Sequence, residues 1–131
     1  NGTIDRRQPD ISGKQLSRTS KTTASLGLQY SRPIFADTML VARLDTAYRS
    51  KQYGDFINAT WVAGRTRSNL RVGLEREQYD LVLWVENLTD DNTPDQSSQN
   101  ASNNLAGSFA WQTTSINLPQ RRYGLTARYR F

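Results

Sequence analysis

Charged side chains recur at every second position along several stretches of this chain, and this spacing decides what chemistry they could perform. Alternation places them together on one side of an extended strand, opposite a side of apolar residues. The charged residues on that side are Arg43, Asp45, Arg71, Glu75, Glu86, Arg122, Arg128 and Arg130. Such a row could guide an anionic ligand, but the favoured interpretation is a charge-paired wall that faces water.

Aromatic residues between these stretches form a second candidate site. They are Tyr53, Phe56, Trp61, Phe109 and Trp111. Aromatic faces can stack on a ligand such as a sugar or an aromatic chelate, and they can also pack loops against each other. The sequence leaves both interpretations open.

Several kinds of catalytic and metal chemistry are excluded by composition. The chain has no cysteine and no histidine, so thiol nucleophiles, thiolate metal sites and the commonest general base are missing. Glu75 and Glu77 share a strand face beside a turn, and the paired carboxylates of glycoside chemistry cannot be assigned from them. The acidic run at 90–95 lacks the glycine and glutamate of a calcium loop, so a turn is expected there. We expect no enzyme activity, no catalytic residue, no metal and no cofactor.

The last stretch, residues 121–131, shows the alternation most clearly. Its odd positions are apolar or aromatic: Tyr123, Leu125, Ala127, Tyr129 and Phe131. Its even positions are small, polar or cationic. This pattern predicts a β-strand with two unlike faces, and the aromatic residues lie near both ends of the apolar face. A soluble strand of this kind would bury that face in a core, whereas a membrane strand would expose it to lipid.

Four further strands are predicted by the same alternation, at residues 22–31, 38–49, 69–77 and 79–87. The first should end at residues 31–33, because proline cannot donate to a strand ladder. Residues 1–21 read as a loop. The connections are alternately short and long, and the long ones are residues 50–64 and 90–120. Residues 57–62 are a candidate extension of the following strand, and residues 109–111 a candidate short strand.

Length and charge fit this interpretation. The chain of 131 residues is one domain at most, and its charge of +5 does not indicate nucleic-acid binding, because the arginines are spaced along strands. Only 36% of residues are hydrophobic, and no apolar run of about 18 residues exists for a helical membrane span. Alternating barrel strands remain compatible with so polar a composition. Since Asn1 is not methionine, we expect a processed chain or part of a longer one.

Three sequence segments, at residues 13–30, 83–90 and 118–131, together resemble the C-terminal end of TonB-dependent outer-membrane receptors. Residues 13–30 resemble a segment that often contains Leu-Pro-Arg-Thr-Pro, with Ser17 and Ser20 in place of the prolines. Residues 83–90 resemble the penultimate strand with its Asn-Leu-Phe-Asp ending, with Thr89 in place of the aromatic. Residues 118–131 are similar to the Pro-Arg-x-Tyr-Gly ending with a terminal aromatic.

The resemblance implies an all-β fold: an antiparallel up-and-down meander of about five strands from the C-terminal end of a large transmembrane β-barrel. Residues 1–131 would be a fragment that closes the barrel wall, with the plug and the N-terminal strands absent from it. The whole protein would be an active transporter of the bacterial outer membrane for a scarce ligand such as a siderophore, cobalamin or an oligosaccharide. A soluble antiparallel β-domain that binds carbohydrate or protein, or a passive porin, is the alternative.

The implied partners follow from the same resemblance. They are the lipid bilayer, the rest of the barrel and the plug, and the outer-membrane assembly machinery, with TonB contacted only through the plug and no nucleic acid. The residues expected to form the assembly signal are Tyr123, Leu125, Tyr129 and Phe131. The residues expected to face lipid are Leu26, Leu28, Leu40, Leu44, Leu70, Val72, Leu81, Leu83, Leu125 and Phe131. An arginine on that face should cost about 2–4 kcal/mol at mid-membrane.

Overall fold

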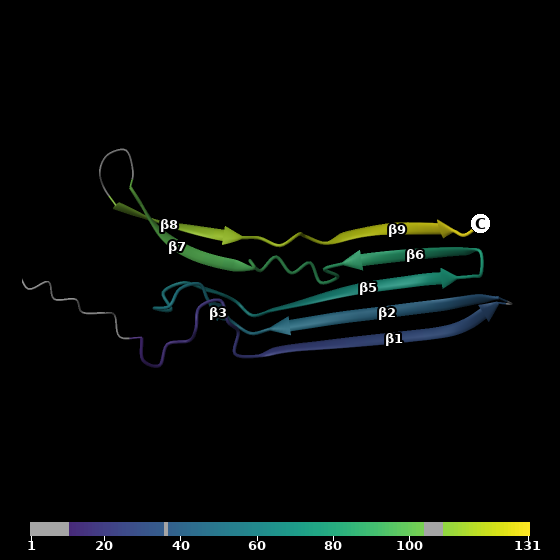
Figure 1. Cartoon of the computed structure of the whole chain (residues 1–131), viewed down its shortest axis with the longest axis horizontal. Helices are drawn as coiled ribbons and strands as arrows, with labels where there is room; N and C mark the ends of the chain where they lie inside the picture. The colour runs from purple at the N-terminus through teal and green to yellow at the C-terminus, as the bar shows by residue number, and fades with distance from the viewer. Residues whose placement is uncertain (1–10, 36, 104–108) are drawn as a thin grey trace, which may run out of the picture.

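The chain forms one five-stranded antiparallel sheet and two short two-stranded sheets (Figure 1) in a computed structural model that describes residues 11–35, 37–103 and 109–131. The strand order in the large sheet is β1-β2-β5-β6-β9. These strands are β1 (Thr23–Phe35), β2 (Thr38–Arg49), β5 (Arg65–Glu75), β6 (Tyr79–Glu86) and β9 (Arg122–Tyr129). The predicted all-β meander of about five strands is confirmed.

Short and long connections alternate along the meander. The turns from β1 to β2 and from β5 to β6 lie at the end of the sheet near the C-terminus (Figure 1). Both long connections lie at the opposite end, which we call the loop end. One contains β3 (Gln52–Tyr53) and β4 (Trp61–Val62), and the other contains β7 (Gln96–Asn103) and β8 (Phe109–Ile116).

The pairing register separates the two faces of the large sheet. Residues directly opposite each other on paired strands point to the same side. One such row is Leu28, Leu44, Leu70, Val85 and Tyr123, and the next is Tyr30, Ala42, Val72, Leu83 and Leu125. We call this side the apolar face. The rows between them contain most of the charged residues and form the polar face, including Gln29, Arg43, Arg71, Trp84 and Gly124.

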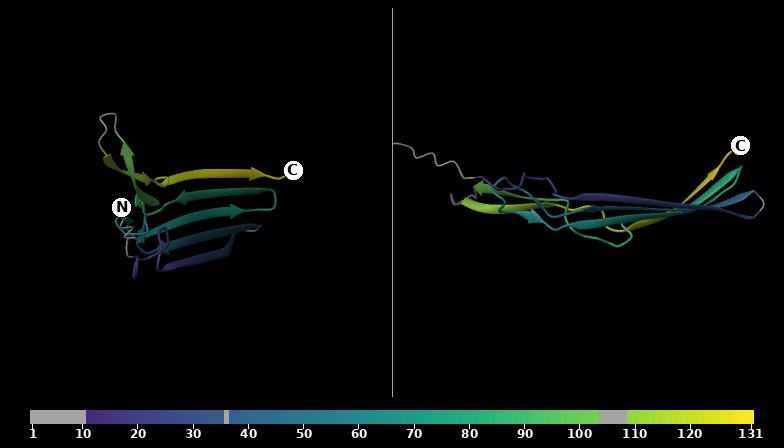
Figure 2. Two further views of the ribbon diagram at one scale, coloured as in Figure 1. Left: turned by 60° about the vertical axis from the view of Figure 1, so that its left-hand side comes forward. Right: turned by 90° about the horizontal axis from the view of Figure 1, so that it is seen from below.

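The large sheet is a single layer. Figure 2 shows it edge-on in its right-hand view, with no second sheet or helix over either face of the described strands. Val62 is the only buried hydrophobic side chain in the part of the chain that the structure describes, and it lies at the loop end. On the apolar face, Leu28, Leu83 and Leu125 are 55%, 52% and 63% exposed. The described residues therefore contain no hydrophobic core under this face. They also contain no helix long and apolar enough to cross a membrane.

The boundaries of two strands correct the sequence predictions. β1 does not end at residues 31–33 but continues through Pro33 to Phe35, with a shift of register between the two. This is possible because β1 is an edge strand in the described sheet. The N–H groups on one side of its backbone have no neighbouring strand to donate to, so a proline, which lacks an N–H group, is tolerated there. β5 begins at Arg65 and not at residue 69, because its pairing with β2 continues as far as Arg49. Backbone pairing thus extends beyond the apolar pattern.

One prediction for the long connections is wrong and another is confirmed. Residues 57–62 do not extend β5, since β4 turns back to pair with β3. The candidate strand at residues 109–111 is confirmed as the start of β8, which pairs with β7 as a hairpin. The hairpin is rich in serine, asparagine and glutamine, which carry no apolar alternation to reveal a strand. The predicted loop at residues 1–21 lies outside the described residues up to residue 10, and the remainder contributes only an isolated bridge from Ser17 to Tyr53.

Candidate functional site

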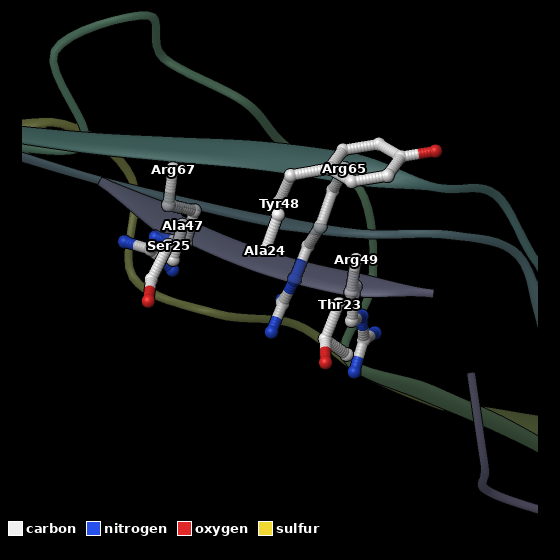
Figure 3. A pocket seen from close by; sticks show the side chains of 8 residues that line it. All are labelled: Thr23, Ala24, Ser25, Ala47, Tyr48, Arg49, Arg65 and Arg67. Carbon is white, nitrogen blue, oxygen red and sulfur yellow. The ribbon is translucent and has the colours of Figure 1, made fainter. Parts of the chain in front are cut away.

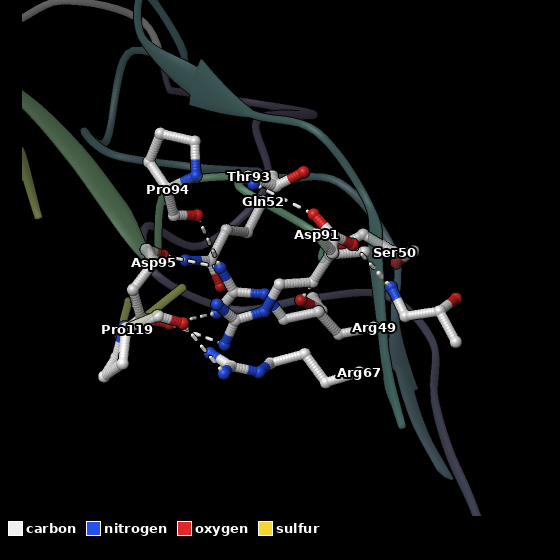
Figure 4. Close-up of polar contacts among 12 residues, drawn as sticks. Arg49, Ser50, Gln52, Arg67, Asp91, Thr93, Pro94, Asp95 and Pro119 are labelled. Carbon is white, nitrogen blue, oxygen red and sulfur yellow. Dashed lines mark hydrogen bonds and ion pairs between the residues drawn. The ribbon is translucent and has the colours of Figure 1, made fainter. Parts of the chain in front are cut away.

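A network of arginine and aspartate side chains joins the polar face to the base of the β7–β8 hairpin (Figure 4). Asp95 receives Arg49 at 3.0 Å and Arg65 at 2.8 Å, and its backbone oxygen accepts from the side chain of Gln52 at 2.8 Å. Arg67 donates to the carbonyl oxygen of Pro119 at 3.1 Å. Only 15–17% of the two Asp95-bound arginine side chains is exposed, so the network is largely removed from water.

A shallow hollow of about 380 Å³ opens beside this network at the edge formed by β1, β2 and β5. Arg49, Arg65 and Arg67 line it together with Thr23 and Ser25. Figure 3 shows the guanidinium groups of Arg49 and Arg65 on one side of the sheet and the Tyr48 ring on the other, as the register requires. The hollow is therefore lined on the polar face by cationic and hydroxyl groups, which are suited to oxygen-rich anions.

The remaining charges on the polar face are mostly paired. Arg43 makes a two-pronged contact with Asp45 at 2.8 Å, and Arg122 contacts Glu86 at 2.5 Å. Asp80 receives Arg128 and Arg130 at the opposite end of the sheet. Arg71 has no ion pair or hydrogen bond from its side chain within the described residues. For most of the face the charge-paired arrangement applies.

The turn after β6 is built around a buried asparagine. Asn87 is fully buried and has a left-handed backbone, with φ 54°. Its side-chain oxygen accepts from the backbone N–H of Asp91 at 3.0 Å, and its amide donates to the Asp91 carbonyl at 3.1 Å. Asparagine is one of the few residues that tolerate this conformation and bond locally at once. The predicted turn is confirmed by the hydrogen bond from the backbone N–H of Asp90 to the Asn87 carbonyl at 2.9 Å. The described residues contain no group of three or more acidic side chains that could hold a metal ion.

Asp91 extends this turn toward the arginine network. Its carboxylate accepts the backbone N–H of Thr66 at 3.1 Å and of Thr93 at 2.9 Å. Burial acts to raise the pKa of Asp91, but the hydrogen bonds from Thr93 and Thr66 and the charge of Arg65 outweigh it and lower the pKa. Asp91 therefore remains ionised where the long connection leaves the sheet.

The structure brings two of the five candidate loop aromatics together. Tyr53 and Trp61 are opposite each other on β3 and β4, and the ammonium of Lys51 lies 4.6 and 4.5 Å from their ring centres. Phe56 lies in the loop between these strands and is 60% exposed. Trp111, on β8, is 75% exposed and makes no ring contact within the described residues. The side chain of Phe109 lies outside them.

The residues assigned to the assembly signal share one face. Tyr123, Leu125 and Tyr129 lie on the apolar face of β9, and all are more than half exposed. Phe131 follows the strand, and its ring meets the edge of Tyr129 at a centroid distance of 5.1 Å. The nine strand residues predicted to share an outward face do so in the register: Leu26, Leu28, Leu40, Leu44, Leu70, Val72, Leu81, Leu83 and Leu125.

Sequence reasoning missed the arginine network at the loop end. Arg65 and Arg67 lie between the predicted connection at residues 50–64 and the predicted strand at residues 69–77, and Asp95 appears only in the acidic run tested as a calcium loop. A signal was present, because residues 65, 67, 69 and 71 continue the polar side of β5 at every second position. The partner Asp95 could not be found this way, since it is far from the arginines in sequence.

Comparisons with known proteins do not identify the chain: no protein-family model, no curated protein and no solved structure matches it.

Proposed function

We propose that this chain forms part of the wall of an outer-membrane β-barrel transporter of the TonB-dependent receptor class, near its C-terminal end. One observation carries the proposal. The described sheet is a single layer with a continuous apolar face that no other described element covers, and the leucines of that face are exposed on β1, β6 and β9 and half-buried on β2 and β5. A face of this kind needs an apolar environment, which the bilayer supplies.

Strand dimensions and the order of the connections support the proposal. β1, β2 and β5 have 13, 12 and 11 residues, which at about 3.3 Å per residue and a tilt of about 40° cross an apolar band about 25 Å tall, whereas β6 and β9, with 8 residues each, are about 26 Å long before any tilt. Short turns gather at one end of the sheet and long connections at the other. That arrangement is typical of outer-membrane barrels, whose long loops face the cell exterior. The resemblance of residues 13–30, 83–90 and 118–131 to the receptor family points the same way.

Two roles follow within the proposal. The chain would close the barrel wall, with β1 and β9 pairing with neighbouring strands through the edges that are unpaired in the described sheet. Tyr123, Leu125, Tyr129 and Phe131 would form the signal read by the assembly machinery. Ligand uptake would depend on the plug, which is not part of this chain, and on TonB, which would contact only the plug.

A fractionation experiment tests the proposal. The full-length protein that contains this chain is expressed in a Gram-negative host, and its distribution between outer-membrane and soluble fractions is measured with and without Phe131. We expect recovery in the outer membrane and a marked loss of that recovery on deletion of Phe131. A Thr89→Ala variant, altered at an exposed position of the turn after β6, is the matched control. A protein that stays soluble and folded would overturn the proposal and favour a soluble β-domain.

A further inference from the structure

We propose that five arginines on the polar face of β2 and β5 form a binding track for a small ligand that has two or more carboxylate or phosphate groups. The arginine track consists of Arg43, Arg49, Arg65, Arg67 and Arg71. This inference rests on the proposed function in one respect, because a barrel wall would turn the polar face toward an interior that a ligand can enter from the loop end.

The register of the track places like charges directly opposite each other. Arg43 pairs with Arg71 across β2 and β5, and Arg49 pairs with Arg65. Side chains in such pairs have Cβ atoms only about 4.5–5.5 Å apart, and like charges there are destabilising. Asp95 already lies between Arg49 and Arg65 and offsets the repulsion in that pair. No carboxylate among the described residues forms ion pairs with both Arg43 and Arg71, so an external anion between these two guanidinium groups would remove the repulsion there.

The carboxylates within reach do not neutralise the track. Among the described residues, only Asp45 and Asp95 form ion pairs with it: Asp45 with Arg43, and Asp95 with Arg49 and Arg65. Five guanidinium groups thus share two ion-paired carboxylates, and Asp91 also acts on Arg65 through its charge, so an excess of two positive charges remains. The side chain of Arg67 donates only to the carbonyl oxygen of Pro119, and that of Arg71 makes no hydrogen bond or ion pair within the described residues. This excess is what a ligand with several negative charges would match.

Two buried donors point to the same conclusion. The Nε atom of Arg49 and the Nη1 atom of Arg65 are buried and have no hydrogen-bond acceptor within the described residues. A buried guanidinium N–H without an acceptor is costly, and more so in a charged group. Both side chains line the hollow of about 380 Å³ at the loop end. Carboxylate or phosphate oxygens placed there could accept from these two atoms once the guanidinium groups turn toward the hollow, since both atoms are covered in this structure.

The hollows along the polar face suggest a small ligand. A second hollow of about 490 Å³ lies beside the first, and Arg67 lines both. Arg43 and Asn69 also line the second, and a third, of about 310 Å³, reaches Arg71. Volumes of this size accommodate small molecules. The three hollows therefore form a row from the loop end along β2 and β5, in which neighbouring hollows share an arginine.

Calorimetry with defined probes tests the track. Citrate and pyrophosphate are titrated into the purified full-length protein in detergent micelles at low ionic strength, with acetate as the single-charge comparison. Arg67→Gln and Arg71→Gln are the test variants, because neither arginine has a carboxylate partner and their loss should disturb folding least. Arg32→Gln is the matched control: it removes the same charge, but its row lies on the apolar face with Leu40 and Leu74.

We expect citrate or pyrophosphate to bind more tightly than acetate. Each test substitution should weaken binding about tenfold, and Arg32→Gln should leave it unchanged. Binding should also weaken as salt is added. Arg67→Lys should restore part of the affinity, since lysine keeps the charge but loses the planar fork. Preference between citrate and pyrophosphate distinguishes a carboxylate ligand from a phosphate ligand.

Three outcomes would contradict the proposal that the arginine track binds a ligand. The first is failure of both probes to bind the unaltered protein, which would leave the arginines as contacts to another part of the protein. The second is unchanged affinity in both test variants, and the third is an equal loss in Arg32→Gln. Fractionation of the same preparations separates this inference from the proposed function. Outer-membrane recovery without binding refutes only the track, and binding by a protein that stays soluble refutes only the barrel.

Discussion

The loop end and the middle of the large sheet differ in how their side chains are covered. At the loop end, long connections fold back so that Gln52, Thr60 and Asn87 are buried and hydrogen-bonded. Val62, the one buried hydrophobic side chain among the described residues, is there too. The apolar face of the large sheet has no such cover, and its leucines are exposed on β1, β6 and β9 and half-buried on β2 and β5. The two regions are therefore built for different surroundings.

Polar contacts cover most of the loop end, because its buried polar side-chain atoms, except Arg49 Nε and Arg65 Nη1, form hydrogen bonds within the described residues. Glycine helps at one point, since a Cβ atom on Gly54 would collide with the backbone oxygen of Ser97 where the two short sheets meet. The apolar face cannot be completed this way, because leucine and valine gain only from leaving water. The comparison shows that the chain's own connections cover the side chains of the loop end, whereas no described residues cover the apolar face of the sheet.

An arginine on the apolar face should have the largest effect. Leu83→Arg is expected to lower the free energy of unfolding by about 2–4 kcal/mol if that face meets lipid. The measurement is guanidinium unfolding of the full-length protein in lipid vesicles. Val82→Arg, one position away on the polar face, is the matched control and should cost much less. Equal costs for the two variants would remove the contrast between the faces.

Removing the buried asparagine should weaken the loop end by a smaller amount. Asn87→Ala leaves the backbone N–H and C=O of Asp91 without their partners and places alanine at a φ of 54°. We expect a loss of about 2 kcal/mol in unfolding free energy, measured by the same titration. Thr89→Ala, in the same turn but exposed, should change it little. A negligible loss for Asn87→Ala would contradict the idea that the loop end depends on buried polar contacts.

The Gly124–Trp84 pair tests packing within the polar face. A Cβ atom on Gly124 would lie only 2.7 Å from Cε2 of the Trp84 ring, so Gly124→Ala must displace the ring and its 3.3 Å hydrogen bond to Thr126. The expected cost is about 1–2 kcal/mol. In a Trp84→Ala background the same substitution should cost nearly nothing, and a double-mutant cycle measures the difference. Additive costs would mean that the ring does not depend on the glycine.

Acid should weaken a contact of the first long connection by the smallest amount. Burial acts to raise the pKa of Asp55, but hydrogen bonds from the Thr60 hydroxyl and from the backbone N–H groups of Ala59 and Thr60 outweigh it and lower the pKa. A pKa lowered in the folded state gives stability that is present above the unfolded pKa of about 3.9 and is lost as pH falls through the folded pKa.

The measurement for Asp55 is the difference in unfolding free energy between the unaltered protein and Asp55→Asn. It should be about 1 kcal/mol at pH 7 and should shrink as the pH falls below about 4. Ala59→Gly, which keeps the carboxylate, is the control and should show no comparable pH-dependent difference. A difference that is the same at pH 7 and pH 3 would show that the carboxylate charge contributes nothing.

Much of the large sheet could be predicted from particular residues. The alternation in Tyr123, Leu125 and Tyr129 gave the strand and its two faces, and the same reasoning located β2 and β6 closely. Strands without apolar alternation could not be predicted in this way. Polar stretches such as β7 contain no apolar residue at every second position, and the predicted strand at residues 69–77 leaves out Arg65 and Arg67, which belong to β5. Pairing with a neighbouring strand supplies backbone hydrogen bonds whatever the side chains are.

The sequence by itself determined the all-β class, the alternating faces and the order of short and long connections, because a period of two is a local property of the chain. Only the tertiary structure decided which charges meet. The pairing of β2 with β5 placed Arg43 opposite Arg71 and Arg49 opposite Arg65, and the long second connection brought Asp95 back to the latter pair. These contacts join residues distant in sequence, so they depend on register and chain path, which no local pattern encodes.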